Sequence, residues 1–150
     1  MTLMDILSVS GLFYERRRPM LNSDAFSYVN ILDKTLDASW TRQTAIANNL
    51  ANVDTPTYKR KDVEFKNILE SELSSPKYRS LDQAVRHADL DALDARVYTD
   101  HANFSYRIDK NNVDVDTENV ELASEQLRYQ ELTTSLRSQF SRFTTAAKSS

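Results

Sequence analysis

Acidic side chains near the end of the chain are its best candidates for chemistry. Four of them fall at positions 1, 3, 5 and 12 of a calcium-binding loop pattern: Asp114, Asp116, Glu118 and Glu125. Asn119 stands where such a loop needs glycine for its turn, and Val120 would supply a backbone carbonyl. From Glu118 onward, however, the residues have the periodicity of a regular helix, which cannot wrap around an ion. We therefore interpret these acids as a helix start, where they complement the macrodipole, and predict no metal site.

The other residue types that carry chemistry do not form a recognisable site. Cysteine is absent, which excludes disulfides, thiol catalysis and cysteine metal ligands. His87 and His101 are the only histidines, and neither has the spacing of a metal motif. One glycine in 150 residues excludes a glycine-rich phosphate loop, and no serine has a nucleophile-elbow context. The sequence therefore predicts a protein with no enzymatic activity and no cofactor.

Composition indicates a single, mainly helical domain. The chain has 150 residues, of which 40% are hydrophobic and 27% charged, and one glycine with three prolines leaves few turns. The net charge of -3 argues against nucleic acid as a partner. The run Lys59–Lys61 is interpreted as a solvated face. No apolar run is long enough for a direct membrane span.

The first 22 residues have no sustained period and are interpreted as a flexible arm or an export tag. Leu3 to Phe13 is apolar, but the basic residues Arg16 to Arg18 follow it, which is the reverse of the order in a secretory signal. If the protein leaves the cytoplasm, we expect it to do so without a cleavable signal peptide.

A helix is predicted over residues 24–51, because Asn22 to Asp24 supply N-cap chemistry and apolar residues then recur at three- and four-residue steps. Ser39 and Gln43 interrupt this stripe. A second, shallower seam of residues spaced by sevens predicts a close neighbour on another side: Ile31, Ala38 and Ala45. Alternatively, the two alanines are simply good helix formers.

A second long helix is predicted over residues 117–147. Acidic residues crowd its start and basic ones its end, as the macrodipole favours. Its main apolar stripe includes Leu132 and Leu136, while Val120 and Leu127 lie on roughly the opposite face. A lone helical hairpin would leave one of these faces in water, so the pattern predicts packing against other chains.

Between the helices, Asn48 to Phe65 forms a corner. Pro56 cannot continue a helix, and the residues after it have partial strand character, so residues 52–66 are predicted as a corner and short extended arm. Residues 67–110 have no strong pattern and are predicted to be a weakly ordered middle segment.

The predicted fold is mainly α, a coiled-coil-like antiparallel pair of long N- and C-terminal helices with a short extended or β arm. The residues expected to pair the helices are Val29, Leu32, Leu36, Trp40, Leu50, Tyr129, Leu132, Leu136, Phe140 and Phe143. The residues expected to contact other subunits are Ile31, Ala38, Ala45, Val120 and Leu127.

Motifs at both ends of this pair resemble the signature of the flagellar basal-body rod, hook and hook-associated axial proteins. In that family an ANNLAN helix end is followed by a T-x-G-Y-K turn, which matches Asn48, Asn49, Leu50, Asn52, Thr55, Pro56, Tyr58 and Lys59. The family's C-terminal helix opens with NNVD and carries LRYQ, as at Asn112–Asp114 and Leu127–Gln130. Thr57 departs from the usual glycine, so the turn must avoid a positive φ or strain a β-branched residue.

The resemblance implies a structural subunit, and the short length without a large middle domain is similar to the proximal rod proteins. It implies type III export, polymerisation into the rod in the periplasm and torque transmission between the inner-membrane ring and the distal rod. The partners it implies are copies of the chain, the rod proteins FlgC, FlgF and FliE, and the inner-membrane MS ring. The residues alone also fit a cytoplasmic helical interaction or adaptor module that forms a stable dimer.

Overall fold

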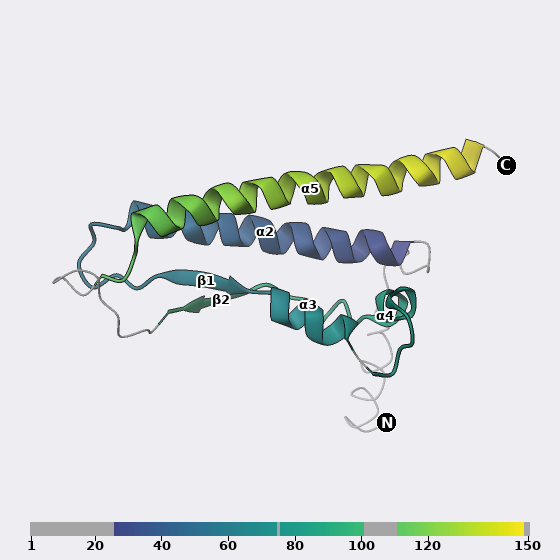
Figure 1. Ribbon diagram of the computed structural model, residues 1–150, viewed down its shortest axis with the longest axis horizontal. Helices are drawn as coiled ribbons and strands as arrows, with labels where there is room; N and C mark the ends of the chain where they lie inside the picture. The colour runs from purple at the N-terminus through teal and green to yellow at the C-terminus, as the bar shows by residue number, and fades with distance from the viewer. Residues whose placement is uncertain (1–25, 75, 101–110, 149–150) are drawn as a thin grey trace, which may run out of the picture.

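Two long helices run side by side and antiparallel along the molecule (Figure 1). Helix α2 spans Ser27–Ala51 and helix α5 spans Val115–Lys148. This computed structural model describes residues 26–74, 76–100 and 111–148. The predicted mainly helical fold with long N- and C-terminal helices is confirmed, and the arm predicted over residues 1–22 lies outside the described residues.

A two-stranded antiparallel sheet follows the corner. β1 (Lys61–Glu64) pairs with β2 (Arg96–Thr99), with Lys61 opposite Thr99 and Glu64 opposite Arg96. The predicted short β arm is therefore confirmed.

Two short helices connect these strands. They are α3 (Lys66–Leu73) and α4 (Leu81–His87), and the Ser80 hydroxyl caps α4 by accepting a hydrogen bond from the Gln83 amide at 3.3 Å. Residues 66–100 are thus more regular than their sequence pattern indicates, because their scattered apolar residues pack against α2.

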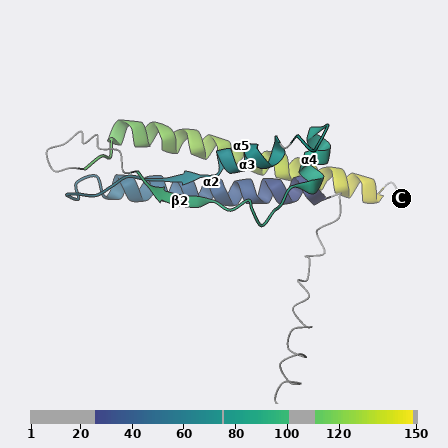
Figure 2. The ribbon, with the colours of Figure 1, turned by 90° about the horizontal axis from the view of Figure 1, so that it is seen from below.

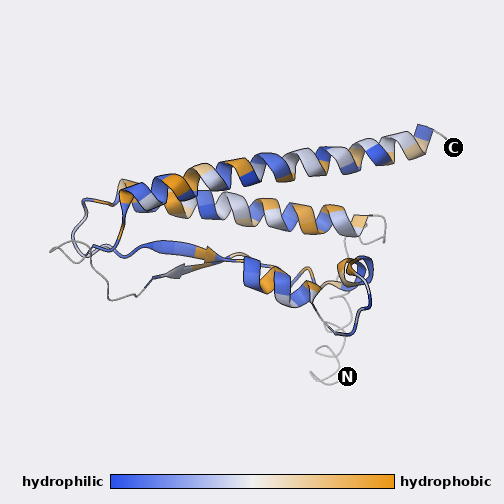
Figure 3. Cartoon of the chain, viewed as in Figure 1, coloured by the Kyte–Doolittle hydropathy of each residue, from blue (hydrophilic) through white to orange (hydrophobic). Residues whose placement is uncertain are grey.

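Helix α2 lies between α5 on one side and the layer of β1, β2, α3 and α4 on the other (Figures 1 and 2). The core between α2 and this layer contains Ile31, Ala38, Phe65, Val85 and Leu93. Helix α5 projects past the start of α2, and hydrophobic residues alternate with hydrophilic ones along it (Figure 3). In the described part of the chain, no helix is both long and apolar enough to cross a bilayer.

Candidate functional site

The side chain of Asn49 connects the end of α2 to β1 and to α5. Its amide donates hydrogen bonds to the Lys61 carbonyl at 2.7 Å and to the Glu118 carboxylate at 3.0 Å. Its oxygen accepts from the Lys61 amide at 2.8 Å and the Tyr58 hydroxyl at 3.2 Å. Asn49 is fully buried. Because all of its hydrogen-bonding capacity is used, Asn49 replaces a missing strand partner along β1 and joins three elements at one point.

Two consecutive asparagines before α5 bind the corner from the other side. The Asn111 amide donates to the carbonyls of Asn52, Val53 and Thr55 at 2.9 to 3.1 Å, and its oxygen accepts from the Val113 amide. The amide oxygen of Asn112 accepts from the Arg60 backbone amide at 2.7 Å. Both asparagines are buried. The polar motif that precedes α5 therefore satisfies backbone groups that the end of α2 leaves without helical partners.

Two arginines and four carboxylates form a charge cluster beside Asn49: Arg42, Arg60, Asp62, Glu118, Glu121 and Glu125. Arg60 binds Glu118 through its Nε and contacts Asp62 at 3.0 Å. Arg42 reaches Asp62 at 3.0 Å and Glu121 at 2.6 Å. Through these contacts, ion pairs link β1, α2 and α5.

Burial and ion pairing have opposite effects on the pKa values of the arginine and carboxylate side chains in this cluster. Burial by itself would lower the pKa of Arg60, but the hydrogen bond and charge of Glu118 outweigh burial, so its pKa is raised. Burial would raise the pKa of Asp62, but the Val63 amide and both arginines stabilise its charged form, so its pKa is lowered. Burial and the Glu118 charge raise the pKa of Tyr58. The fold thus favours the ionised forms of Arg60 and Asp62 and the neutral form of Tyr58.

The cluster has the character of a structural joint. Among the residues that the structure describes, no three histidine or acidic side chains are placed to hold a metal ion. Glu118 and Glu125 of the calcium-like pattern point to arginines instead. Asp114 accepts hydrogen bonds from the Asp116 amide at 3.1 Å and the Thr117 hydroxyl at 2.9 Å, as a helix-opening residue does.

The turn of the corner itself is closed by short-range bonds and one strained residue. The Asn52 side chain donates to the Asn48 carbonyl at 2.8 Å and accepts from the Thr55 hydroxyl at 3.2 Å. Asn52 has φ of -109°, so α2 does not end in a left-handed asparagine. Thr57 instead has φ of 63°, a conformation that costs a β-branched residue free energy and that glycine adopts freely.

Of the residues expected to pair the helices, Trp40 and Tyr129 contact each other across α2 and α5, and for the others the pairing stays a prediction. Val29 is buried and most of the others are half-buried. The ring centroids of Phe26 and Phe143 are 4.9 Å apart, and those of Trp40 and Tyr129 are 6.4 Å apart. Phe140 is 49% exposed, because the three- and four-residue steps of the seam place Gln139 on the seam instead.

The residues expected to contact other subunits divide into two groups. The prediction is wrong for Ile31 and Ala38, which belong to the core that the chain's own α3, α4 and β1 complete, and Ala45 is also buried within the chain. The physical reason is that residues 63–95 supply enough apolar side chains to cover this seam. Val120 and Leu127, by contrast, are 71% and 61% exposed.

Sequence reasoning missed the charge cluster. The run Lys59–Lys61 predicts a solvated Arg60, but its side chain is only 16% exposed. One pattern could have revealed its partners: Glu118 and Glu125 fall on the same seven-residue seam as Leu132, and a carboxylate in a seam needs a cation.

Similarity to a protein family and to several known proteins identifies the class of protein to which this chain belongs. Residues 33–59 match the model of the flagella basal body rod proteins. The flagellar basal body rod protein FlgB of Bacillus subtilis is 37% identical over 110 residues, which cover 73% of this chain and 84% of the relative. FlgB of Borrelia hermsii is 33% identical over 112 residues, which cover 67% and 81%. FlgB of Escherichia coli is 31% identical over 96 residues, which cover 59% and 70%.

The fold and these similarities define a flagellar basal body rod protein, a structural subunit rather than an enzyme. Within that class the chain belongs to the FlgB family. The buried asparagine joint is thus built by the two motifs on which the sequence resemblance rests.

Proposed function

We propose that this protein polymerises with copies of itself and with other rod proteins into the proximal rod, which connects the inner-membrane ring to the distal rod. The observation that carries the proposal is the outer face of α5. Val120 and Leu127 each lie two residues beyond a buried glutamate, Glu118 and Glu125, which places them about 200° around the helix, away from α2. Two large apolar residues repeated on a solvent-facing side favour burial against another chain.

Polymerisation also agrees with how little of α5 its own chain covers. In the described part of α5, only Glu118 and Glu125 are buried, so most of the helix surface is exposed. A face on one copy that binds a different face of the next copy generates an open helical tube. Long paired helices that neighbours share would give this tube the stiffness needed to transmit torque.

We further propose the partners and location that the family membership favours. The partners are FlgC, FlgF and FliE next to copies of the chain, with the MS ring as a contact at the base. The location is the rod in the periplasm, reached by type III export without a cleavable signal peptide.

Leu127→Asp tests the proposal, because a carboxylate on the outer face of α5 cannot be buried without a partner. We expect cells that carry this variant in place of the native protein to lose swimming in soft agar and to yield no rod-containing basal bodies. The isolated variant should keep the helix content of the native chain by circular dichroism, since Leu127 is exposed within the monomer.

Gln126→Asp is the matched control, because Gln126 is also exposed on α5 but lies about 100° away from Leu127. It should leave swimming and basal-body yield unchanged. Normal rods in the Leu127→Asp cells would rule out this face as a subunit contact. Absence of the native chain from purified basal bodies would contradict the proposed function as a whole.

A further inference from the structure

The small sheet of β1 and β2 has one closed edge and one open edge. On the β1 side, the Asn49 side chain binds the outward-facing amide and carbonyl of Lys61 at 2.8 and 2.7 Å. The next outward amide, that of Val63, donates to the Asp62 carboxylate at 2.7 Å. On the other side β2 forms the border of the sheet, and no described element lies beyond it (Figure 1). The outer side of β2 is therefore the open edge.

The pairing with β1 shows which backbone groups of β2 face outward. The Asp100 amide donates to the Arg60 carbonyl at 2.8 Å, and hydrogen-bonded pairs alternate along an antiparallel ladder. With the observed register, every second residue of β2 turns its backbone toward β1, and Val97 and Thr99 turn theirs away. Neither of these two forms a hydrogen bond on its outer side within the described residues. Each thus offers an amide and a carbonyl to an added strand.

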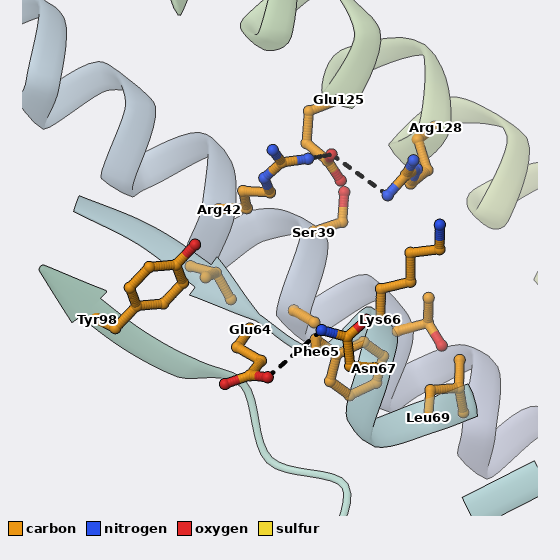
Figure 4. A pocket seen from close by; sticks show the side chains of 13 residues that line it. Ser39, Arg42, Glu64, Phe65, Lys66, Asn67, Leu69, Tyr98, Glu125 and Arg128 are labelled. Carbon is orange, nitrogen blue, oxygen red and sulfur yellow. Dashed lines mark hydrogen bonds and ion pairs between the residues drawn. The ribbon is translucent and has the colours of Figure 1, made fainter. Parts of the chain in front are cut away.

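The side chains of β2 leave this edge accessible. Val97 and Tyr98 are 53% and 47% exposed, and Arg96 is exposed beside them. The Tyr98 ring points over the sheet toward Arg42 and not across the open edge (Figure 4). A sheet of two strands gains stability from further strands, so pairing at this edge is favourable.

The sequence of the open edge is complementary to itself. In an antiparallel pair of two copies centred on Tyr98, Val97 of each copy lies opposite Thr99 of the other. Every outward amide and carbonyl of these residues then has a partner. The same register places Arg96 opposite Asp100 of the second copy. Arg96 forms no ion pair within the described residues of its own chain, so a carboxylate of the second copy supplies one.

Charge also alternates across the four strands of such a pair. Within one copy Glu64 lies opposite Arg96, and Arg60 lies opposite Asp100 on the same face of the sheet. The row across both copies is then Glu64 and Arg96 of one copy followed by Asp100 and Arg60 of the other. Each charge in the row neighbours an opposite charge. A register shifted by two residues separates Arg96 from Asp100, so complementarity selects this register and this strand of a second copy.

We propose that two unassembled copies of this chain pair through β2 into one antiparallel sheet of four strands. A two-fold contact of this kind closes on itself, whereas a rod needs contacts that repeat from head to tail. The pair therefore belongs to the protein before it enters the rod, and it protects an open edge from strand addition by other chains. The copies separate when they join the rod. This inference does not depend on the proposed rod function.

Single cysteines at the centre of the pair test its register, because the native chain has no cysteine. Tyr98 faces its own counterpart, so full-length Tyr98→Cys chains should form a disulfide-linked dimer under mild oxidation. Val97→Cys is the matched control, since Val97 is similarly exposed but lies two residues along the strand from its counterpart, beyond the reach of about 7 Å for a disulfide. The Tyr98→Cys dimer should form at least about tenfold faster. Equal rates for the two variants would contradict the register.

Charge exchange tests the partner by sedimentation equilibrium. In dimers of identical chains, Arg96→Asp and Asp100→Arg each create like-charge pairs, so each should raise the dimer dissociation constant by about tenfold or more. An equimolar mixture of the two variants should dimerise as the native chain does, because the exchanged charges then face each other. Circular dichroism should show native helix content for both variants.

Two results would overturn the strand pairing. One is a native chain that sediments as a monomer even at millimolar concentration, and the other is a mixture of the charge variants that is no more dimeric than its separate components. Both results would leave the proposed rod function standing. That function fails instead if the native chain is absent from purified basal bodies, whatever its state in solution.

Discussion

Different kinds of interaction stabilise the two halves of the α2–α5 pair, the half next to the corner and the far half. At the corner, Asn49, Arg42 and Arg60 bind Glu118, Glu121 and Glu125 through directional hydrogen bonds and ion pairs that are buried or partly buried. At the other half, contact is made by aromatic and aliphatic side chains that stay partly exposed, such as Phe26 against Phe143 and Trp40 against Tyr129. The contacts of the first half depend on direction, whereas those of the second depend mainly on apolar contact.

This difference suggests how a small subunit can have a defined shape and still polymerise. The corner half fixes the angle at which α5 leaves the turn, since a displaced α5 would leave buried charges without partners. The far half keeps apolar surface exposed, and burial of that surface in an assembly would be favourable. The directional contacts within the chain are thus concentrated in the corner half, whereas exposed apolar side chains occur in both halves of α5, Val120 and Leu127 near the corner and Phe140 farther along.

Arg60→Ala should break the corner half and produce the largest effect. Its removal leaves Glu118 buried without its principal cation, which should cost about 3–5 kcal/mol in the free energy of unfolding. Urea denaturation of the isolated chain measures this cost. Arg137→Ala, which removes an exposed arginine from the far half of α5, should change stability by less than about 0.5 kcal/mol. Equal costs for the two variants would contradict the distinction between the halves.

Asn49→Ala should have the next largest effect. It leaves the Lys61 backbone groups and the Glu118 carboxylate short of a partner, so we expect a loss of about 2–3 kcal/mol by urea denaturation. Asn48→Ala is the matched control, since Asn48 belongs to the same motif but its side chain is exposed. If both substitutions cost the same, the motif would stabilise the helix end in general and not through the Asn49 side chain.

The sequence predicted the elements of this fold much better than the contacts of the joint. Apolar periodicity located α2 and α5 because such periodicity reports a local property of each helix. The role of Asn49 depends on Glu118, which is 69 residues away, and a single sequence does not show which distant residues meet. The polarity of Ser39 and Gln43 predicts two interruptions of the apolar stripe on α2. Their spacing, however, continues the three- and four-residue steps of that stripe.

Leu136→Ala tests the far half, where we expect a smaller loss of about 1–2 kcal/mol. A fully buried leucine would cost more, but Leu136 is only half-buried in the isolated chain. Thermal unfolding of the dilute chain measures the loss, and Leu127→Ala, on the exposed outer face, should change little. A loss as large as that of Arg60→Ala would mean that the far half is as tightly specified as the corner.

Thr57→Gly should produce the smallest change and the only gain. Thr57 holds φ of 63°, which is unfavourable for a β-branched residue, and glycine relieves that strain at the cost of a more flexible unfolded chain. The balance should stabilise the isolated protein by about 0.5–1 kcal/mol in urea denaturation. Thr57→Val keeps the β-branch and should give no gain. Equal stability of all three chains would mean that the neighbouring asparagine joint, and not the turn residue, determines the geometry of the corner.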